Sequence, residues 1–93
     1  MINFGSQMGL ACVTSTALTI PTADPLGVNR TPSMALVRVE GASVRYRDDG
    51  TAPTASVGMN LNIGDVLKFD GDLTKLRFIQ QSATATLNVI YYG

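Results

Sequence analysis

Few side chains in this sequence could support catalysis or bind a transition metal. The chain has no histidine and a single cysteine, Cys12, so neither a Ser-His-Asp nor a Cys-His arrangement can be assembled. The same shortage argues against an ordinary zinc site, which takes three or four protein ligands. Cys12 lies between the apolar residues Ala11 and Val13, which favours a buried, inert thiol over a reactive one. We therefore predict that the protein is not an enzyme and has no catalytic residues.

Carboxylates are the remaining candidates for chemistry, and they lie beside glycines. The pairs Asp48/Asp49 and Asp70/Asp72 each neighbour a turn glycine. Calcium takes oxygen ligands from loops, but neither pair has the spacing of the twelve-residue calcium loop. Short polar side chains next to a glycine are typical of tight turns. We interpret both pairs as turn-forming aspartates and expect no cofactor, with calcium at either pair as the alternative.

The balance of charge argues against nucleic-acid and membrane partners. Seven basic residues offset seven acidic ones, and charged residues make up only 15% of the chain. No long-range field therefore attracts a nucleic acid or an anionic bilayer. Arg45-Tyr46-Arg47 could suggest a basic-aromatic patch, but strand alternation places Tyr46 on the opposite face from both arginines. A near-zero net charge on a charge-poor surface favours self-association instead.

Targeting signals are not evident. Residues 1–4 show no basic cluster followed by an apolar run, so no signal peptide is predicted. No apolar stretch approaches the roughly 20 residues that span a bilayer. We expect a soluble protein made in the cytoplasm.

The elements that must position these residues are strands. Helix-favouring residues are sparse, with one Glu and two Lys, and Gly or Pro recurs every several residues. One or two short strands are expected within residues 10–20. Apolar and polar residues alternate over further segments, which we predict to be strands: 35–40, 44–47, 58–63, 66–69, 73–78 and 83–92. The last alternation is the longest, and its uncharged second face indicates a central strand or an oligomer seam.

Two local predictions follow from this alternation. Segments 35–40 and 44–47 are expected to pair as a hairpin around Gly41. The outward face of that hairpin would carry Arg38, Glu40, Arg45 and Arg47. In segment 58–63, the residues expected to point inward are Met59, Leu61 and Ile63.

The strand count predicts the fold class. Seven or eight short strands with turn signals about every 8 to 12 residues are typical of an all-β sandwich. We predict a compact, single-domain, antiparallel β-sandwich of the small jelly-roll type over residues 1–93. Residues 1–9 and 21–33 are expected to form arm or loop segments, because the second segment contains three of the four prolines.

The C-terminal part of the chain resembles a known family. Residues 44–54 (VRYRDDGTAPT), followed by 58–59 (GM) and 64–67 (GDVL), are similar to a segment of small proteins of tailed bacteriophages and prophages. Residues 76–92 match the C-terminal end of that family pattern. The resemblance covers residues 36–93 and is carried by these motifs.

The resemblance implies a structural role in a virion. Small phage β-sandwiches with few charges are similar to head decoration or cement proteins, which cap the capsid as trimers. We therefore expect a homotrimer that binds the major capsid protein or other virion proteins and is located in the virion after synthesis in the host cytoplasm. No nucleic-acid or membrane partner is expected. Candidate interface residues are Arg38, Arg45, Arg47 and Tyr92.

Two other functions remain open at this point. A tail- or fibre-associated module could bind a carbohydrate or receptor through exposed aromatic and amide side chains, namely Tyr46, Asn60, Asn62 and Tyr92. Three tyrosines and no tryptophan are few for such a site. A small inhibitor of a host factor, or a cryptic enzyme, is the other alternative, although inhibitors of that kind often carry strong net charge.

Overall fold

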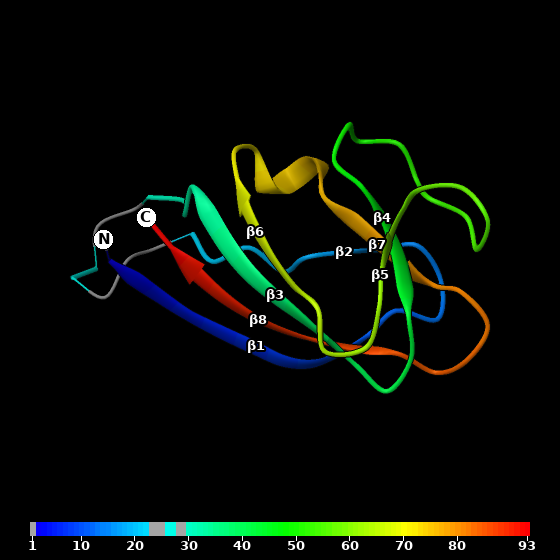
Figure 1. Cartoon of the computed structure of the whole chain (residues 1–93). Coiled ribbons are helices and arrows are strands. Elements are labelled where there is room, and N and C mark those ends of the chain that lie inside the picture. Colours follow the sequence, from blue (N-terminus) through cyan, green and yellow to red (C-terminus); the bar gives the residue numbers. More distant parts are fainter. Residues whose placement is uncertain (1, 23–25, 28–29) are drawn as a thin grey trace.

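A computed structural model of the chain describes residues 2–22, 26–27 and 30–93 (Figure 1). The described residues form eight strands and one short 3-10 helix. The strands are β1 (Asn3–Ala11), β2 (Thr16–Ala17), β3 (Met34–Glu40), β4 (Val44–Arg47), β5 (Met59–Leu61), β6 (Val66–Asp70), β7 (Arg77–Gln80) and β8 (Thr86–Tyr92). The helix, η1 (Leu73–Lys75), precedes β7. The all-β prediction is confirmed.

The strands form two antiparallel sheets of four. Sheet A has the order β1-β8-β3-β6, and sheet B has the order β2-β7-β4-β5. The pairings are nested, because β4 pairs with β5, β3 with β6, β2 with β7 and β1 with β8. Additional pairing of β3 with β8 and of β4 with β7 rolls this folded ribbon into two layers. The arrangement is an eight-stranded jelly roll, which confirms the predicted β-sandwich.

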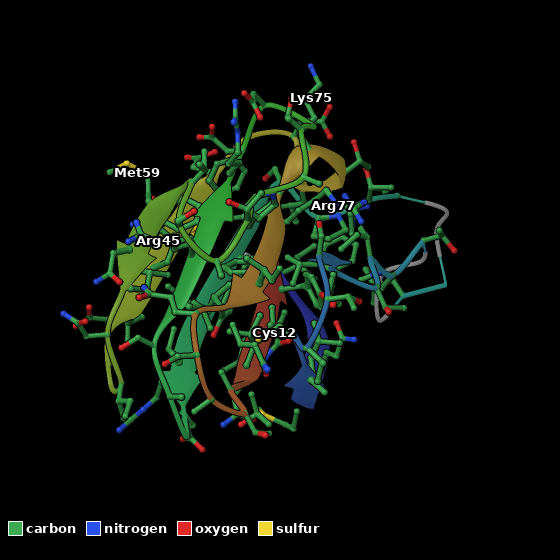
Figure 2. The ribbon with its side chains drawn as sticks, turned by 90° about the vertical axis from the view of Figure 1, so that its right-hand side faces the viewer. Cys12, Arg45, Met59, Lys75 and Arg77 are labelled. Carbon is green, nitrogen blue, oxygen red and sulfur yellow. The ribbon has the colours of Figure 1, made fainter. Side chains whose placement is uncertain are left out.

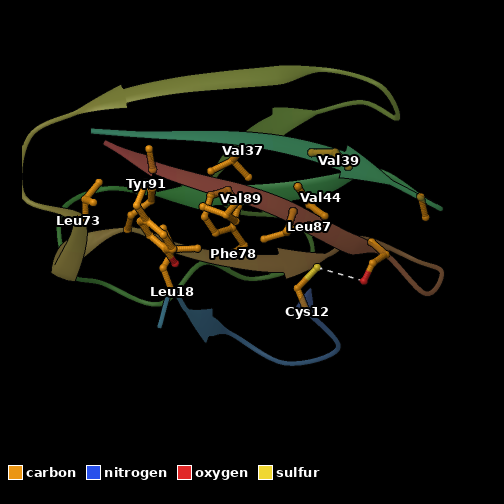
Figure 3. Packing of buried hydrophobic residues seen from close by; sticks show 14 residues of the cluster. Cys12, Leu18, Val37, Val39, Val44, Leu73, Phe78, Leu87, Val89 and Tyr91 are labelled. Carbon is orange, nitrogen blue, oxygen red and sulfur yellow. Dashed lines mark hydrogen bonds between the residues drawn. The ribbon is translucent and has the colours of Figure 1, made fainter. Parts of the chain in front are cut away.

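The core lies between the two sheets and is built by strand alternation (Figure 3). Val37 of β3 and Val89 of β8 are fully buried from sheet A, and Val44 and Phe78 are fully buried from sheet B. Successive side chains in a strand point to opposite faces, so the alternation over 35–40 and 83–92 determines which residues enter the core. Complete burial of a side chain of this size stabilises the fold by about 1.5–3 kcal/mol.

The predicted hairpin between segments 35–40 and 44–47 is wrong. β3 belongs to sheet A and β4 to sheet B, so the turn at Gly41 is an arch that crosses the sandwich. Gly41 has a φ of +82°, and a Cβ there would lie 3.0 Å from the carbonyl oxygen of Thr84. Alternation shows which face of a strand is buried but not which strand lies beside it.

The expectation that residues 1–9 form an arm is also wrong from Asn3 onward. This segment belongs to β1, which pairs with β8 along the edge of sheet A. Gly5 and Gly9 have φ values of +107° and +70°, and the register shifts next to both. These β-bulges interrupt the apolar alternation, so the strand pattern is obscured in the sequence.

The long connection between β2 and β3 falls in the predicted loop 21–33. Its described residues form no strand, and residues 23–25 and 28–29 lie outside the described part of the chain. Pro32 is buried, and the Ser33 N–H donates to the Tyr92 carbonyl oxygen at 3.0 Å. The connection is therefore attached to sheet A where it enters β3.

The predicted inward orientation within 58–63 holds only for Leu61. Met59 is 64% exposed and Ile63 is 61% exposed. β5 is a three-residue edge strand of sheet B. It ends where the Asn62 N–H donates to the Asp65 carboxylate at 2.8 Å, so Ile63 lies in a turn rather than on a buried face.

Candidate interaction surface

Cys12 is part of the packed hydrophobic core. Its side chain is fully buried, and its Sγ donates to the carbonyl oxygen of Ala85 at 3.4 Å. Burial raises the pKa of this thiol, so the nucleophilic thiolate is disfavoured at neutral pH. The prediction of a buried cysteine is confirmed, and its low reactivity stays a prediction.

Two of the predicted turn aspartates have partners within their own turns. Arg47 donates to both carboxylate oxygens of Asp49, at 3.2 and 2.5 Å, and with the Thr51 N–H it lowers the pKa of Asp49 to about 2. Asp72 caps η1 by accepting from the hydroxyl and N–H of Thr74 at 2.5 and 3.0 Å, which lowers its pKa. The turn interpretation is confirmed for both. Across the described ranges, no three His, Cys, Asp or Glu side chains gather to hold a metal.

The four residues predicted to contact partners lie on two different surfaces. Arg38 and Tyr92 belong to the outer face of sheet A, on β3 and β8. Arg45 and Arg47 project from β4 of sheet B, and Figure 2 shows Arg45 there. This separation follows from the arch at Gly41, which the sequence does not reveal.

The arginines of sheet B attach loops to the sandwich. Arg45 donates to the carbonyl oxygens of Ala55 and Gly58 at 3.1 and 3.0 Å, so it holds the connection between β4 and β5. Arg77 donates to the hydroxyl and the carbonyl oxygen of Ser15, both at 2.9 Å, and holds the turn between β1 and β2. These guanidinium groups already have acceptors within the chain.

The residues considered for a sugar site are not gathered together. Asn60 donates to the Asn62 side-chain oxygen at 3.0 Å and accepts from Gln81, which ties β5 to the connection after β7. Tyr46 packs against the core, and Tyr92 lies on sheet A. These four candidate residues therefore do not form one surface.

The outer face of sheet A carries apolar residues that sequence reasoning did not single out as contact residues. Leu36 and Ile90, on the two central strands, are directly opposite each other in the β3–β8 pairing. Met8 on β1 is 60% exposed and Val66 on β6 is 58% exposed. We call Met8, Leu36, Val66 and Ile90 the sheet A patch. The outward face of an antiparallel sheet is commonly polar, whereas contiguous exposed apolar side chains mark interaction surfaces.

Polar groups surround this patch. Arg38 and Asn88 complete the lining of a shallow hollow of about 230 Å³ over the patch. Asn88 accepts from the Gly9 N–H at 2.9 Å, and Arg38 lies 3.7 Å from Glu40 in an exposed ion pair. An apolar centre with a polar rim is typical of protein interfaces. The sequence signal was the uncharged second face of the strand predicted over 83–92.

Comparison of the chain with protein-family models, curated protein sequences and solved structures finds no match. In the described part of the chain, no helix has the length and apolar character needed to cross a membrane.

Proposed function

We propose that this chain is a non-enzymatic structural protein of a bacteriophage virion, which binds and stabilises the capsid as a head decoration or cement protein. The sheet A patch is the observation that carries the proposal. Four apolar side chains from four strands lie on the outward face, where isolated protein would leave them in water. Burying apolar surface against another protein stabilises the complex by roughly 25 cal/mol per Å², before the costs of association.

The fold suits a protein that works by occupying a fixed place. The jelly roll recurs in viral capsid proteins, and this chain's arginines fasten its loops to the sandwich. When a rigid copy is repeated by the symmetry of a shell, each copy adds a small interface and the contributions accumulate. The resemblance of residues 36–93 to small phage proteins supports the choice of a virion as that assembly.

The thiol, carboxylate and amide groups that could take part in catalysis or ligand binding are instead used to hold the fold together, which also favours this proposal. Cys12 is buried in the core, and Asp49 and Asp72 hold turns. The amides of Asn60 and Asn62 bond to each other. A site for sugar recognition would need such groups to be open on one surface.

The copy number of the protein in purified virions tests the proposal. Quantitative mass spectrometry against the major capsid protein measures this ratio directly. About one copy per capsid subunit is the expected result for a decoration protein. A handful of copies per virion would contradict the decoration role and indicate a neck, tail or fibre position, and absence from virions would contradict the proposal as a whole.

A further inference from the structure

The outward side chains of sheet A form rows, because the central strands are paired without a bulge. Successive cross-strand pairs on β8 and β3 are Tyr92 with Met34, Ile90 with Leu36, Asn88 with Arg38, and Thr86 with Glu40. Met34 is covered by its own chain and is only 6% exposed, so on β3 the open residues of this face begin at Leu36. On β6, the outward residues opposite the first three β3 positions are Asp70, Lys68 and Val66. On β1, Asn3 lies opposite Tyr92 and Ser6 opposite Ile90, and Met8 lies in the bulge beside Asn88.

We propose that sheet A of one copy packs face to face on sheet A of a second copy, around a two-fold axis parallel to the strands. The inference deepens the proposed function and rests on it, since it takes the sheet A patch as the interaction surface and names a second copy of this chain, rather than a capsid subunit, as the protein that covers it. Rotation about such an axis exchanges β8 with β3 and β1 with β6 while keeping each row at its height. Each residue of β8 then faces the β3 residue of the same row in the partner, and each residue of β1 faces the β6 residue of the same row.

The exchanged rows match in character. Leu36 faces Ile90 of the partner subunit, and Met8 faces Val66 of the partner subunit. Arg38 faces the amide of the partner's Asn88. The charged rim residues meet uncharged polar ones: Lys68 faces the partner's Ser6, Asp70 faces the partner's Asn3, and Glu40 faces the partner's Thr86. No two like charges are opposed, which is the condition that a self-complementary interface must meet.

A two-fold axis perpendicular to the strands does not give this match. If that axis lies between the Leu36 row and the Arg38 row, Leu36 is opposite the partner's Arg38. If it lies on the Leu36 row, Lys68 is opposite the partner's Lys68. The first leaves an apolar side chain against a charge, and the second opposes like charges. The pattern of side chains therefore selects the axis parallel to the strands. Sheets in sandwiches also pack with their strands nearly aligned, about 10 Å apart.

The size of the face indicates a moderate association. Four strands about 4.8 Å apart, with seven residues rising about 3.3 Å each in β3 and β8, give a planar footprint of about 440 Å². With side-chain relief, the two copies together would bury about 1,000 Å², the lower limit of specific interfaces. We expect a dimer that forms with rising concentration. Such a pair differs from the trimer that the family resemblance implies.

A charge-exchange experiment on the full chain tests both the surface and the axis. Met8→Lys and Val66→Glu each place two unpaired charges in the proposed dimer, so each should weaken dimerisation by about a hundredfold. The double variant should return it to within about tenfold of wild type, because opposite charges meet across the axis. Within one copy, β1 and β6 are three strand spacings apart, about 14 Å, so an ion pair there would need both side chains fully extended across the sheet. Val57→Glu, on an exposed loop residue, is the matched control.

Sedimentation velocity and native mass spectrometry give the readout, with circular dichroism showing that each variant is folded. The proposal predicts a wild-type dimer, weaker single variants, a rescued double variant and an unaffected Val57→Glu control. A wild-type monomer up to about millimolar concentration, a trimer, or a double variant without rescue would each overturn it. A wild-type monomer in solution with the expected copy number in virions would overturn the dimer alone, whereas a solution dimer with absence from virions would overturn the virion role alone, so the two failures can be distinguished.

Discussion

Alkaline titration of Tyr91 probes the packing of the core. The Tyr91 side chain is 2% exposed, and its hydroxyl donates to the Gln7 side-chain oxygen at 2.8 Å. Burial raises the pKa of Tyr91 from its ordinary value of 10.0 to about 12. The unfolded chain therefore releases this proton near pH 10, whereas the folded chain retains it until about pH 12. The stabilising contribution is complete below pH 10 and is lost as the pH rises from 10 to 12.

The magnitude is large for a chain of this size. Two pKa units at 1.36 kcal/mol each amount to about 2.7 kcal/mol, most of it lost by pH 12, out of a total stability of about 5–14 kcal/mol for 93 residues. Tyr91→Phe removes the ionisation and loses one hydrogen bond, at a cost of about 1 kcal/mol. Gln7 keeps the Thr19 N–H as a donor at 3.2 Å. The variant should be less stable than wild type at pH 8 and equally stable near pH 11.

Urea unfolding followed by circular dichroism from pH 8 to 11.5 measures the effect. Tyr92→Phe is the matched control, because Tyr92 is only half-buried and lies on the outward face of β8. We expect the stability curves of wild type and Tyr91→Phe to cross, whereas the Tyr92→Phe curve should run parallel to wild type. A constant difference between wild type and Tyr91→Phe throughout this range would refute the reasoning.

Three further predictions address the turns and the thiol. Gly58→Ala should reduce the unfolding free energy by about 3 kcal/mol, because a Cβ there lies 3.0 Å from a backbone oxygen at a φ of +139°. Gly64→Ala, with open space around it, should cost about 1 kcal/mol, and equal losses in urea titrations would contradict this. The pKa of Asp49 is lowered to about 2, so the stabilisation from its ionised carboxylate is present above about pH 4 and is lost towards pH 2. Asp49→Asn should reduce the pH dependence of the unfolding free energy between pH 4 and pH 2, and an effect no larger than that of Asp48→Asn would count against it. Cys12 should react with an aromatic disulfide reagent at the rate of unfolding, and labelling of the native protein within seconds would disprove its burial.

The sequence predicts those parts of the fold that depend on alternation alone. β3 and β8 were identified because their apolar residues recur every second position and enter a shared core. The turns at Asp49 and Asp72 follow from short polar side chains beside glycine. These features are local, so no knowledge of distant contacts is needed.

The remaining features depend on contacts between segments that are far apart in the sequence. The arch at Gly41 and a tight hairpin have the same local pattern, and the difference lies in which strands become neighbours. β1 was missed because Gly5 and Gly9 form bulges within it. Met8 and Val66 are brought to one face only by the order of strands in sheet A, so the complete patch could not be predicted from sequence.

Oxidation of two methionines tests most directly the central claim that the outer face of sheet A is the interface. Met8, in the sheet A patch, is 60% exposed, and Met59, on the edge strand of sheet B, is 64% exposed. In dilute, monomeric protein the two thioethers should react with hydrogen peroxide at similar rates. In concentrated protein and in purified virions, peptide mass spectrometry should show Met8 protected and Met59 still oxidised. Equal oxidation of both residues in the assembled state, or protection of Met59 alone, would contradict the claim.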